Sequence, residues 1–256
     1  MTSVGIVVLT SVRDTGGCDQ NGCWVPTPSG QQYMRGAVEE LAHQCSPGGA
    51  LYGLFHLAAV VTDDREKDLR GSGCSAFPRL DQRWIHPLDL MCVGRRVVDM
   101  TYNVESEFRF LPRDDTLGRA RKKLAFEDTV MGIVSHVDAG VILSDHYMAR
   151  IEHLHKLMPG KVLNIHPAVT CLESPFCFRG KTPTADAIRY AVEHPEMEVR
   201  TGATLHHVVD EIDAGPIIHW DGPTRVFSTD VPPLLRLRNY REAKLPVLIE
   251  GLRRLR

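Results

Sequence analysis

Val-Leu-Asn-Ile-His-Pro, residues 162–167, decides both the fold and the position of the candidate site. An apolar strand here delivers Asn164 and His166 to its own carboxyl end, where open α/β sheets bind their ligands. Further along the chain come Thr-Gly-Ala-Thr-Leu-His (201–206) and Asp-Glu-Ile-Asp-Ala-Gly-Pro (210–216), a strand and an acidic loop. We expect this loop at the same carboxyl edge, so that an amide, an imidazole and a carboxylate meet in one site.

Strands and helices alternate along the rest of the chain. Short β-branched runs predict buried strands at 4–9, 55–62, 139–143 and 161–165. A charged stretch before the third of these runs favours an amphipathic helix, because apolar residues recur in it near helical spacing: Leu117, Ala120, Leu124, Met131 and Val134. Residues 183–194 predict another helix. This order is typical of an α/β, Rossmann-like fold with a mostly parallel central sheet flanked by helices.

The remaining segments are less regular. Residues 217–220 and 225–227 predict strands, and 230–255 predicts a C-terminal helix with one apolar face: Leu245, Leu248, Leu252 and Leu255. Residues 63–96 carry Gly, Cys, Pro and Arg without a period, which predicts an insertion or a long loop. A chain of 256 residues suits a single domain over 1–256.

Composition excludes several classes of partner. Thirty Lys and Arg residues nearly balance 32 Asp and Glu residues, so no large field recruits nucleic acid or a membrane, and a small-molecule substrate is expected. No apolar run approaches the ~20 residues that span a bilayer, and the run at 4–9 is too short for a signal peptide. We therefore predict a cytoplasmic protein. The oligomeric state is open, with a homodimer as one alternative.

The seven cysteines form no recognisable disulfide framework. Cys18 with Cys23, or Cys171 with Cys177, could share a metal ion, but neither pair has the Cys-x-x-Cys spacing of zinc sites. Free thiols are the favoured interpretation.

The motifs around Asn164, His166 and Asp213 resemble those of the folate-dependent formyltransferases, the family of glycinamide ribonucleotide and methionyl-tRNA formyltransferases. In that family an Asn-x-His-Pro strand end and an Asp-x-Gly-Pro loop form one active site. The resemblance implies that these three residues are the catalytic trio, that N10-formyltetrahydrofolate is the co-substrate, and that a small-molecule amine is the acceptor. It covers residues 140–220, and the first hundred residues resemble the family only in outline.

Formyl transfer explains why these residue types would be needed. An amine that attacks the formyl carbon makes a tetrahedral adduct whose oxygen becomes negative, so the site must offer donors there. Asn164 would supply an amide N–H, and protonated His166 a charged donor that Asp213 favours. Asp213 would also relay a proton to the departing folate nitrogen. Each residue alone has an ordinary reading as a turn or strand-end residue, but their joint spacing favours the functional one.

The resemblance also assigns residues around the trio. Two loops would form the folate pocket, and their candidate residues are Tyr147, Met148, Ile151, Asp210 and Glu211. His206 would support the active site. Each of these residues also has an open structural alternative. Met148 and Ile151 would pack in the core, and Asp210 and Glu211 would be solvated charges in a turn. His206 would be a structural imidazole.

His166, His206 and Asp213 also have the side-chain types of a metal site. A metal ion would occupy the imidazole lone pair that a protonated His166 must use for its proton. The two hypotheses exclude each other, and we expect no metal.

The acceptor region departs from the family pattern. Purine-pathway members follow their first strand with a Gly-rich segment that holds the substrate phosphate, whereas residues 10–17 read Thr-Ser-Val-Arg-Asp-Thr-Gly-Gly and run into a Cys-bearing loop that reaches residue 30. Residues 168–175 also differ, while Arg179-Gly180-Lys181 keeps a basic turn before a helix. Arg13 and Arg179 are the candidate acceptor-binding residues, in a rebuilt pocket.

The sequence thus predicts an N-formyltransferase that acts on an amine or hydroxylamine of a small metabolite, in a specialised biosynthetic role. A formyltetrahydrofolate hydrolase, in which water replaces the amine, is the first alternative. A catalytically silent folate-binding protein is the second, and the intact trio of Asn164, His166 and Asp213 argues against it.

Overall fold

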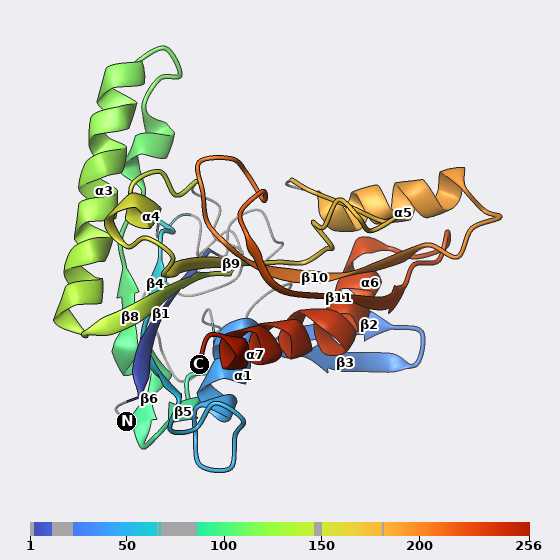
Figure 1. Cartoon of the computed structure of the whole chain (residues 1–256), viewed down its shortest axis with the longest axis horizontal. Helices are drawn as coiled ribbons and strands as arrows, with labels where there is room; N and C mark the ends of the chain where they lie inside the picture. Colours follow the sequence, from blue (N-terminus) through green and yellow to red (C-terminus); the bar gives the residue numbers. More distant parts are fainter. Residues whose placement is uncertain (1–2, 12–22, 66, 68–85, 146–149, 181) are drawn as a thin grey trace.

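The computed structural model describes residues 3–11, 23–65, 67, 86–145, 150–180 and 182–256 (Figure 1). Its centre is a seven-stranded sheet in the order β11-β10-β9-β8-β1-β4-β7. Neighbours from β7 to β9 run parallel, whereas β10 is antiparallel to β9 and β11 is antiparallel to β10. The strands are β1 (Val4–Thr10), β4 (Phe55–Thr62), β7 (Thr101–Asn103), β8 (Ala139–Ser144), β9 (Val162–His166), β10 (Arg200–His207) and β11 (Ile217–Arg225).

Helices cover both faces of the sheet, which explains why its central strands are almost continuously apolar. On one face, Ile6 and Val8 of β1 belong to the same buried cluster as residues of α1 (Ala37–Gln44) and α7 (Leu245–Arg254). On the other face, Val7 and Leu9 share a cluster with residues of α3 (Thr116–His136) and α4 (Leu154–Leu157) (Figure 1).

Helix α3 buries a different stripe from the one that its apolar spacing indicated. Leu117 is 84% exposed and Leu124 is 43% exposed. The buried residues are Lys123, Phe126, Glu127, Val130 and Val134, which recur at the spacing of one helix face. The prediction of a helix was right, but its face was right only at the C-terminal end, where Val134 is buried; at the N-terminal end Leu117 and Leu124 are exposed, because two charged residues occupy core-facing positions.

Glu127 caps the segment that leads into α4. Its side chain is 1% exposed. Its carboxylate accepts hydrogen bonds from the backbone N–H groups of Glu152 (2.9 Å), His153 (2.7 Å) and Leu154 (2.8 Å). These bonds satisfy donors that a short helix leaves unpaired at its start. Glu127 therefore fixes the chain that returns from the carboxyl end of β8.

Replacing Glu127 by Ala should lower the free energy of unfolding by about 3 kcal/mol, since one buried and two partly buried backbone donors lose a charged acceptor at once. Urea unfolding followed by circular dichroism measures the change. Glu193→Ala is the control, because that side chain is 58% exposed and its loss should cost under about 0.5 kcal/mol. Equal stabilities for the two variants would contradict the role assigned to Glu127.

The sheet edge at β11 is a single strand rather than two short ones. The register against β10 shifts between Thr201 and Ala203, where the sequence Asp221-Gly222-Pro223 passes. A bulge at Gly and Pro lets one strand continue through residues that a period-2 pattern would exclude. This bulge explains why the sequence pattern breaks between residues 220 and 225.

Smaller elements complete the described chain. They are the hairpins β2 (Cys23–Thr27) with β3 (Gly30–Met34) and β5 (Met91–Cys92) with β6 (Arg95–Arg96), the 3-10 turns η1 (Val97–Met100) and η2 (Glu107–Phe110), and the helix α5 (Pro183–Glu193). Of the expected insertion at 63–96, residue 66 and residues 68–85 lie outside the described residues.

The C-terminal helical region is interrupted near its middle. Helix α6 (Pro232–Asn239) leads into η3 (Tyr240–Lys244), one turn of π-helix, and then into α7. Pro246 follows closely, and a proline removes one helical hydrogen bond and crowds the carbonyl four residues earlier. A π-turn accommodates that conflict, and such turns are frequent at functional sites.

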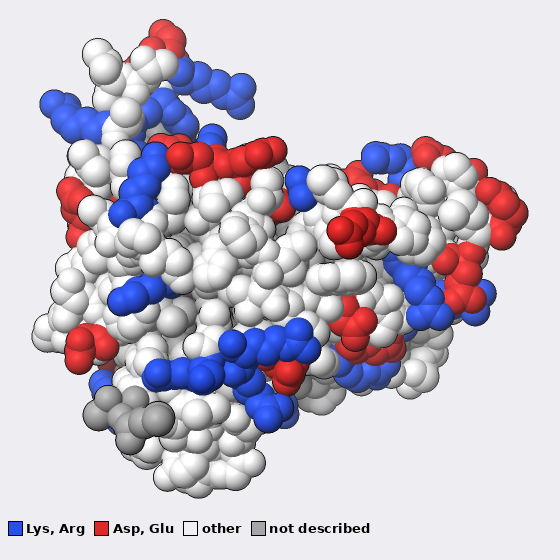
Figure 2. All heavy atoms as spheres, viewed as in Figure 1, with Lys and Arg blue, Asp and Glu red and all other residues white. Residues whose placement is uncertain are grey.

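Three further features concern membrane spans, surface charge and thiols. No helix in the described part of the chain is long and apolar enough to cross a membrane. On the face shown in Figure 2, basic and acidic side chains are interspersed. Cys45, Cys92, Cys171 and Cys177 are free thiols.

Candidate active site

The antiparallel direction of β10 sets the geometry of the site. Asn164 pairs in register with His206, and His166 pairs with Thr204. The loop 208–216 therefore leaves β10 beside the amino end of β9, where the Val208 N–H donates to the Val162 carbonyl (2.8 Å). The loop was expected at the carboxyl edge, and it begins at the opposite edge. It folds back over the sheet instead, as the orange segment between β10 and β11 shows in Figure 1.

Asp213, on this returning loop, joins the predicted residues into one cluster. Its Oδ1 lies 3.5 Å from His166 Nδ1 and 3.7 Å from His206 Nε2, and it accepts a hydrogen bond from Asn164 Nδ2 (3.4 Å). Its Oδ2 accepts from the Gly180 N–H (3.0 Å). The four side chains therefore meet although they come from two strands and a loop.

The backbone at Asp213 is in the left-handed region, with φ of 54°. Non-glycine residues rarely adopt this conformation, although Asp and Asn tolerate it best. Such outliers cluster at functional sites because surrounding structure must hold them. Here the strained turn aims the carboxylate back at β9.

The carboxyl group of Asp213 is ionised at neutral pH. Burial raises its pKa, but the contacts with the His206 and His166 rings and the hydrogen bond from the Gly180 N–H together outweigh burial. The net pKa lies below the ordinary value for Asp. The site therefore holds a fixed negative charge beside two imidazoles.

His166 is neutral in the ligand-free protein. Burial lowers its pKa, and the Asp213 carboxylate and the Phe178 carbonyl offset this only in part, because His206 and Lys244 lower the pKa further. Nε2 lies 3.0 Å from the Phe178 carbonyl, which can only accept, so Nε2 carries the proton. This differs from the resting imidazolium that the sequence suggested. Both ring nitrogens nevertheless face acceptors, so a proton gained during a reaction would be held by two hydrogen bonds.

His206 orients the amide of Asn164. Its Nδ1 donates to the His207 carbonyl (3.0 Å), which leaves Nε2 to accept from Asn164 Nδ2 at 3.2 Å. His206 is buried and Asn164 is partly exposed. Asn164 is thus held at the accessible side of the cluster by two long hydrogen bonds, which a substrate oxygen can replace at little cost.

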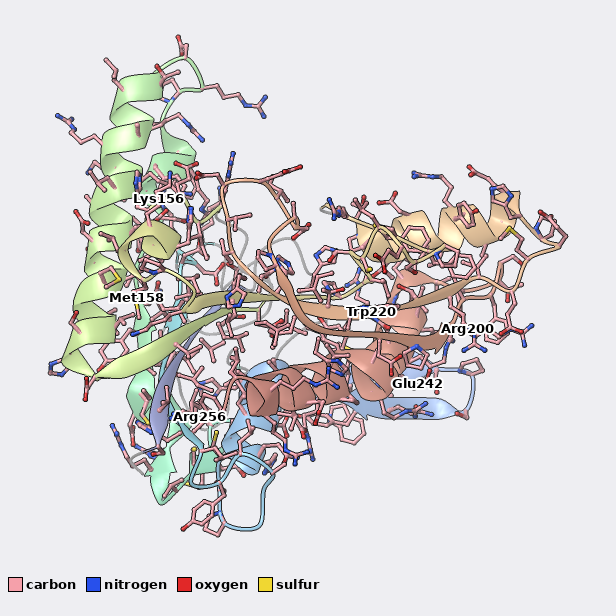
Figure 3. The ribbon with its side chains drawn as sticks, in the orientation of Figure 1. Lys156, Met158, Arg200, Trp220, Glu242 and Arg256 are labelled. Atoms are coloured by element: carbon pink, nitrogen blue, oxygen red, sulfur yellow. The ribbon has the colours of Figure 1, made fainter. Side chains whose placement is uncertain are left out.

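The predicted folate-binding residues are only partly placed. Tyr147 and Met148 lie outside the described residues, and the side chain of Ile151 is buried in the apolar cluster beneath α3. Asp210 is exposed and pairs with Lys156 Nζ at 2.8 Å, in the region labelled at Lys156 in Figure 3. Glu211 is exposed. Their contact with folate stays a prediction.

The two predicted acceptor-binding residues also stay predictions. Arg13 lies outside the described residues. Arg179 donates from Nε (3.2 Å) and Nη2 (2.9 Å) to the Thr170 carbonyl, so its guanidinium braces the segment 170–179. Sequence reasoning missed the Phe178 carbonyl and the Gly180 N–H, which are backbone groups. The only signal for them was the glycine in the basic turn, where φ is 95°.

No group of three His, Cys, Asp or Glu side chains among the described residues is arranged to hold a metal ion. The cluster around Asp213 is instead joined by hydrogen bonds and charge contacts between its own members.

Comparison with known proteins identifies the family of the chain. A family model described as formyl transferase matches residues 99–234, more than half of the chain. The chain belongs to the formyl transferase family. Among solved structures, PvdF of pyoverdin biosynthesis, an N10-formyltetrahydrofolate-dependent formyltransferase, is 27% identical with a TM-score of 0.86 and 98% coverage of both chains. The predicted family, fold class and enzyme class are confirmed, and PvdF supports the predicted co-substrate.

More distant structures share the fold. Glycinamide ribonucleotide transformylase 1 from Geobacillus kaustophilus is 18% identical, with a TM-score of 0.59 and coverage of 99% of this chain and 98% of that one. A formyltetrahydrofolate deformylase from Pseudomonas syringae is 23% identical, with a TM-score of 0.58; 98% of this chain aligns with 61% of that one. A comparison with curated protein sequences gave no match.

Proposed function

We propose that this member of the formyl transferase family moves a formyl group from N10-formyltetrahydrofolate to an amine or hydroxylamine of a small metabolite. The observation that carries the proposal is the cluster in which an ionised Asp213 faces His166, His206 and the amide of Asn164. The similarity to PvdF over nearly the whole of both chains supports the folate donor and a role in specialised biosynthesis.

The proposed reaction uses three groups. The acceptor nitrogen attacks the formyl carbon, and the oxyanion that forms takes a hydrogen bond from Asn164 Nδ2. The proton released by the acceptor nitrogen passes to the Asp213–His166 pair, where the Nδ1 of His166 can hold it. The same proton then goes to the N10 atom as the C–N10 bond breaks, which yields the formylated acceptor and tetrahydrofolate. Hydrogen bonds that are long before substrate binds are expected to tighten in the complex.

The weak basicity of the site favours a nucleophile that is already neutral. The pKa values of Asp213 and His166 both lie below their ordinary values. An alkylammonium group with a pKa of about 10.4, such as a lysine side chain, therefore keeps its proton at pH 7. An N-alkylhydroxylamine is largely neutral at that pH. Within the proposed acceptor classes, the hydroxylamine fits the site better.

Matched pairs of amines and hydroxylamines on the same carbon skeleton test this expectation. At pH 7 only about one alkylamine molecule in 10³ is neutral, so we expect the hydroxylamine to be formylated at least about 10²-fold faster, and the ratio to narrow as the pH rises. Mass spectrometry of the products and loss of formylfolate give the rates. Glycinamide ribonucleotide serves as a comparison compound. A ratio near one at pH 7 that does not change with pH would contradict the preference.

Hydrolysis of formyltetrahydrofolate is the second candidate, because a deformylase shares the fold. Formate release without any amine distinguishes the two. We expect slow release of formate in the absence of acceptor. Once acceptor is added, formyl transfer should outpace this release. Release at an equal rate with and without acceptors would favour the hydrolase, and tight folate binding without turnover of any compound would favour a silent binding protein.

A further inference from the structure

An ion pair that solvent does not reach lies behind the candidate site. Lys244 Nζ is 2.5 Å from Asp145 Oδ1, and both side chains are 0% exposed. Nζ also lies 4.0 Å from the centre of the Tyr240 ring. Among the described residues, the two charges have no side-chain partner beyond each other and Tyr240, which also interacts with Lys244. The two charges are thus buried with only each other and Tyr240 to compensate them.

The pair connects the C-terminal helical region to the sheet. Lys244 ends η3, the π-turn, while Glu242 of the same turn, labelled in Figure 3, is exposed. Asp145 directly follows β8, and its backbone N–H donates to the Leu9 carbonyl of β1 (2.9 Å). One end of the pair is therefore fixed to two central strands, and the other to the helical region.

A second contact connects the same helical region to His166. Asn239, the residue before η3, is 3% exposed, and its Nδ2 donates to the carbonyls of Pro167 (3.1 Å) and Gly202 (2.8 Å). Pro167 is the residue after His166, and Gly202 lies on β10. The ends of β8, β9 and β10 are therefore all held by buried polar groups from residues 239–244.

Stability alone gives no reason for the ion pair. Removing two charges from water is costly, and replacing a buried pair by apolar residues of similar size is often neutral or stabilising. Only each other and Tyr240 compensate the two charges for the loss of water. Asp145 directly follows Ser144, which pairs in register with Asn164, so the ion pair stands beside the strand that carries the site. This position points to a role in the reaction.

We propose that Lys244, clamped by Asp145, is a positioning residue for formyl transfer: it fixes His166 and supplies a constant positive charge behind the position where the oxyanion develops. The inference rests on the proposed function. Lys244 acts through His166 and its field, since Asn164 and Asp213 are the groups placed against the reacting atoms.

The charges around His166 predict the direction in which its pKa changes when Lys244 is replaced. Asp213, from the loop 208–216, raises the pKa of His166, whereas His206, from β10, and Lys244, from η3, lower it. The Phe178 carbonyl also raises it. Removing the positive charge of Lys244 should therefore raise the pKa of His166.

The double variant Lys244→Met/Asp145→Leu tests the inference because it leaves no unpaired buried charge. We expect it to fold with a Tm no lower than that of the parent, and to lose about ten- to a hundredfold in kcat with little change in the KM for formylfolate. The pKa of His166, followed by NMR titration of its ring, should rise by about half a unit or more. Glu250→Leu/Arg253→Met is the matched control, because it removes an exposed ion pair of 3.1 Å from α7. The control should leave the Tm, the kcat and the pKa of His166 unchanged.

Asp145→Asn should shift the pKa of His166 in the opposite direction or not at all. It keeps the side-chain volume and leaves the charge of Lys244 without its partner, so the pKa of His166 should fall or stay level. An unchanged kcat in the folded double variant would overturn the inference, and so would a lower kcat with an unchanged pKa of His166. A double variant that does not fold would also overturn it, because the pair would then be a stabilising contact. The NMR titration needs no acceptor, so failure of the wild-type protein to formylate any compound would refute the proposed function separately.

Discussion

Asp213→Asn is expected to lower kcat for formyl transfer by about 10³-fold, because the carboxylate faces every other polar side chain of the cluster and is the group through which the acceptor proton passes. Asparagine keeps the size of the side chain and tolerates the left-handed backbone at this position, where φ is 54°. Its amide oxygen can still accept from the Gly180 N–H. The variant therefore removes the charge without releasing the turn.

Single-turnover kinetics with formylfolate and the acceptor measure this loss at the chemical step. Folate binding should stay within about threefold, since the charge matters for the reaction and not for the fold. Asp128→Asn, at an exposed position on α3, is the control and should be indistinguishable from the parent. Turnover of the Asp213 variant within tenfold of the parent would remove Asp213 from the proposed mechanism.

His166→Gln is expected to lower kcat by about 10²- to 10³-fold. A glutamine amide can replace the Nε2–H that donates to the Phe178 carbonyl, so the strand end should keep its structure. It cannot take up the proton that Nδ1 would receive, and it offers no cation beside the oxyanion.

The loss should be measured at saturating formylfolate, with His136→Gln at an exposed position of α3 as control. Because the imidazole is neutral in the resting protein, activity of the parent should not require prior protonation of His166, and the variant should lose activity to a similar degree across neutral pH. Normal turnover of the His166 variant would show that His166 is not the proton acceptor and would contradict the proposed mechanism.

The parts of the fold that depend on local pattern were predictable from the sequence. The apolar runs that became β1, β4, β8 and β9 are buried on both faces, so each stands out against its polar neighbours. The direction of β10 was not predictable, because a period-2 pattern carries no information about parallel or antiparallel pairing. For that reason Asn164, His166 and Asp213 were found, while the path that brings Asp213 back was not.

Buried charges were the second feature that could not be predicted from the sequence. Lys123 and Glu127 occupy the core-facing stripe of α3, and a count of apolar residues assigns both to the solvent. Lys244 carried a weak signal, since it follows Tyr240 by four residues and precedes Leu248 and Leu252 at the same interval. A lysine on the apolar stripe of a helix, just before a proline, would have indicated a buried cation, but not its partner Asp145.

The hairpin that carries Asp213 has a consequence for how the enzyme responds to heat. The loop 208–216 is held by β10 and by β11, which is the edge strand of the sheet. Edge segments open at lower free energy than central strands, and they do so without global unfolding. Release of β11 would withdraw the carboxylate while β1, β4 and β8 stay paired. We therefore expect catalysis to be lost at a lower temperature than the one at which the central strands melt.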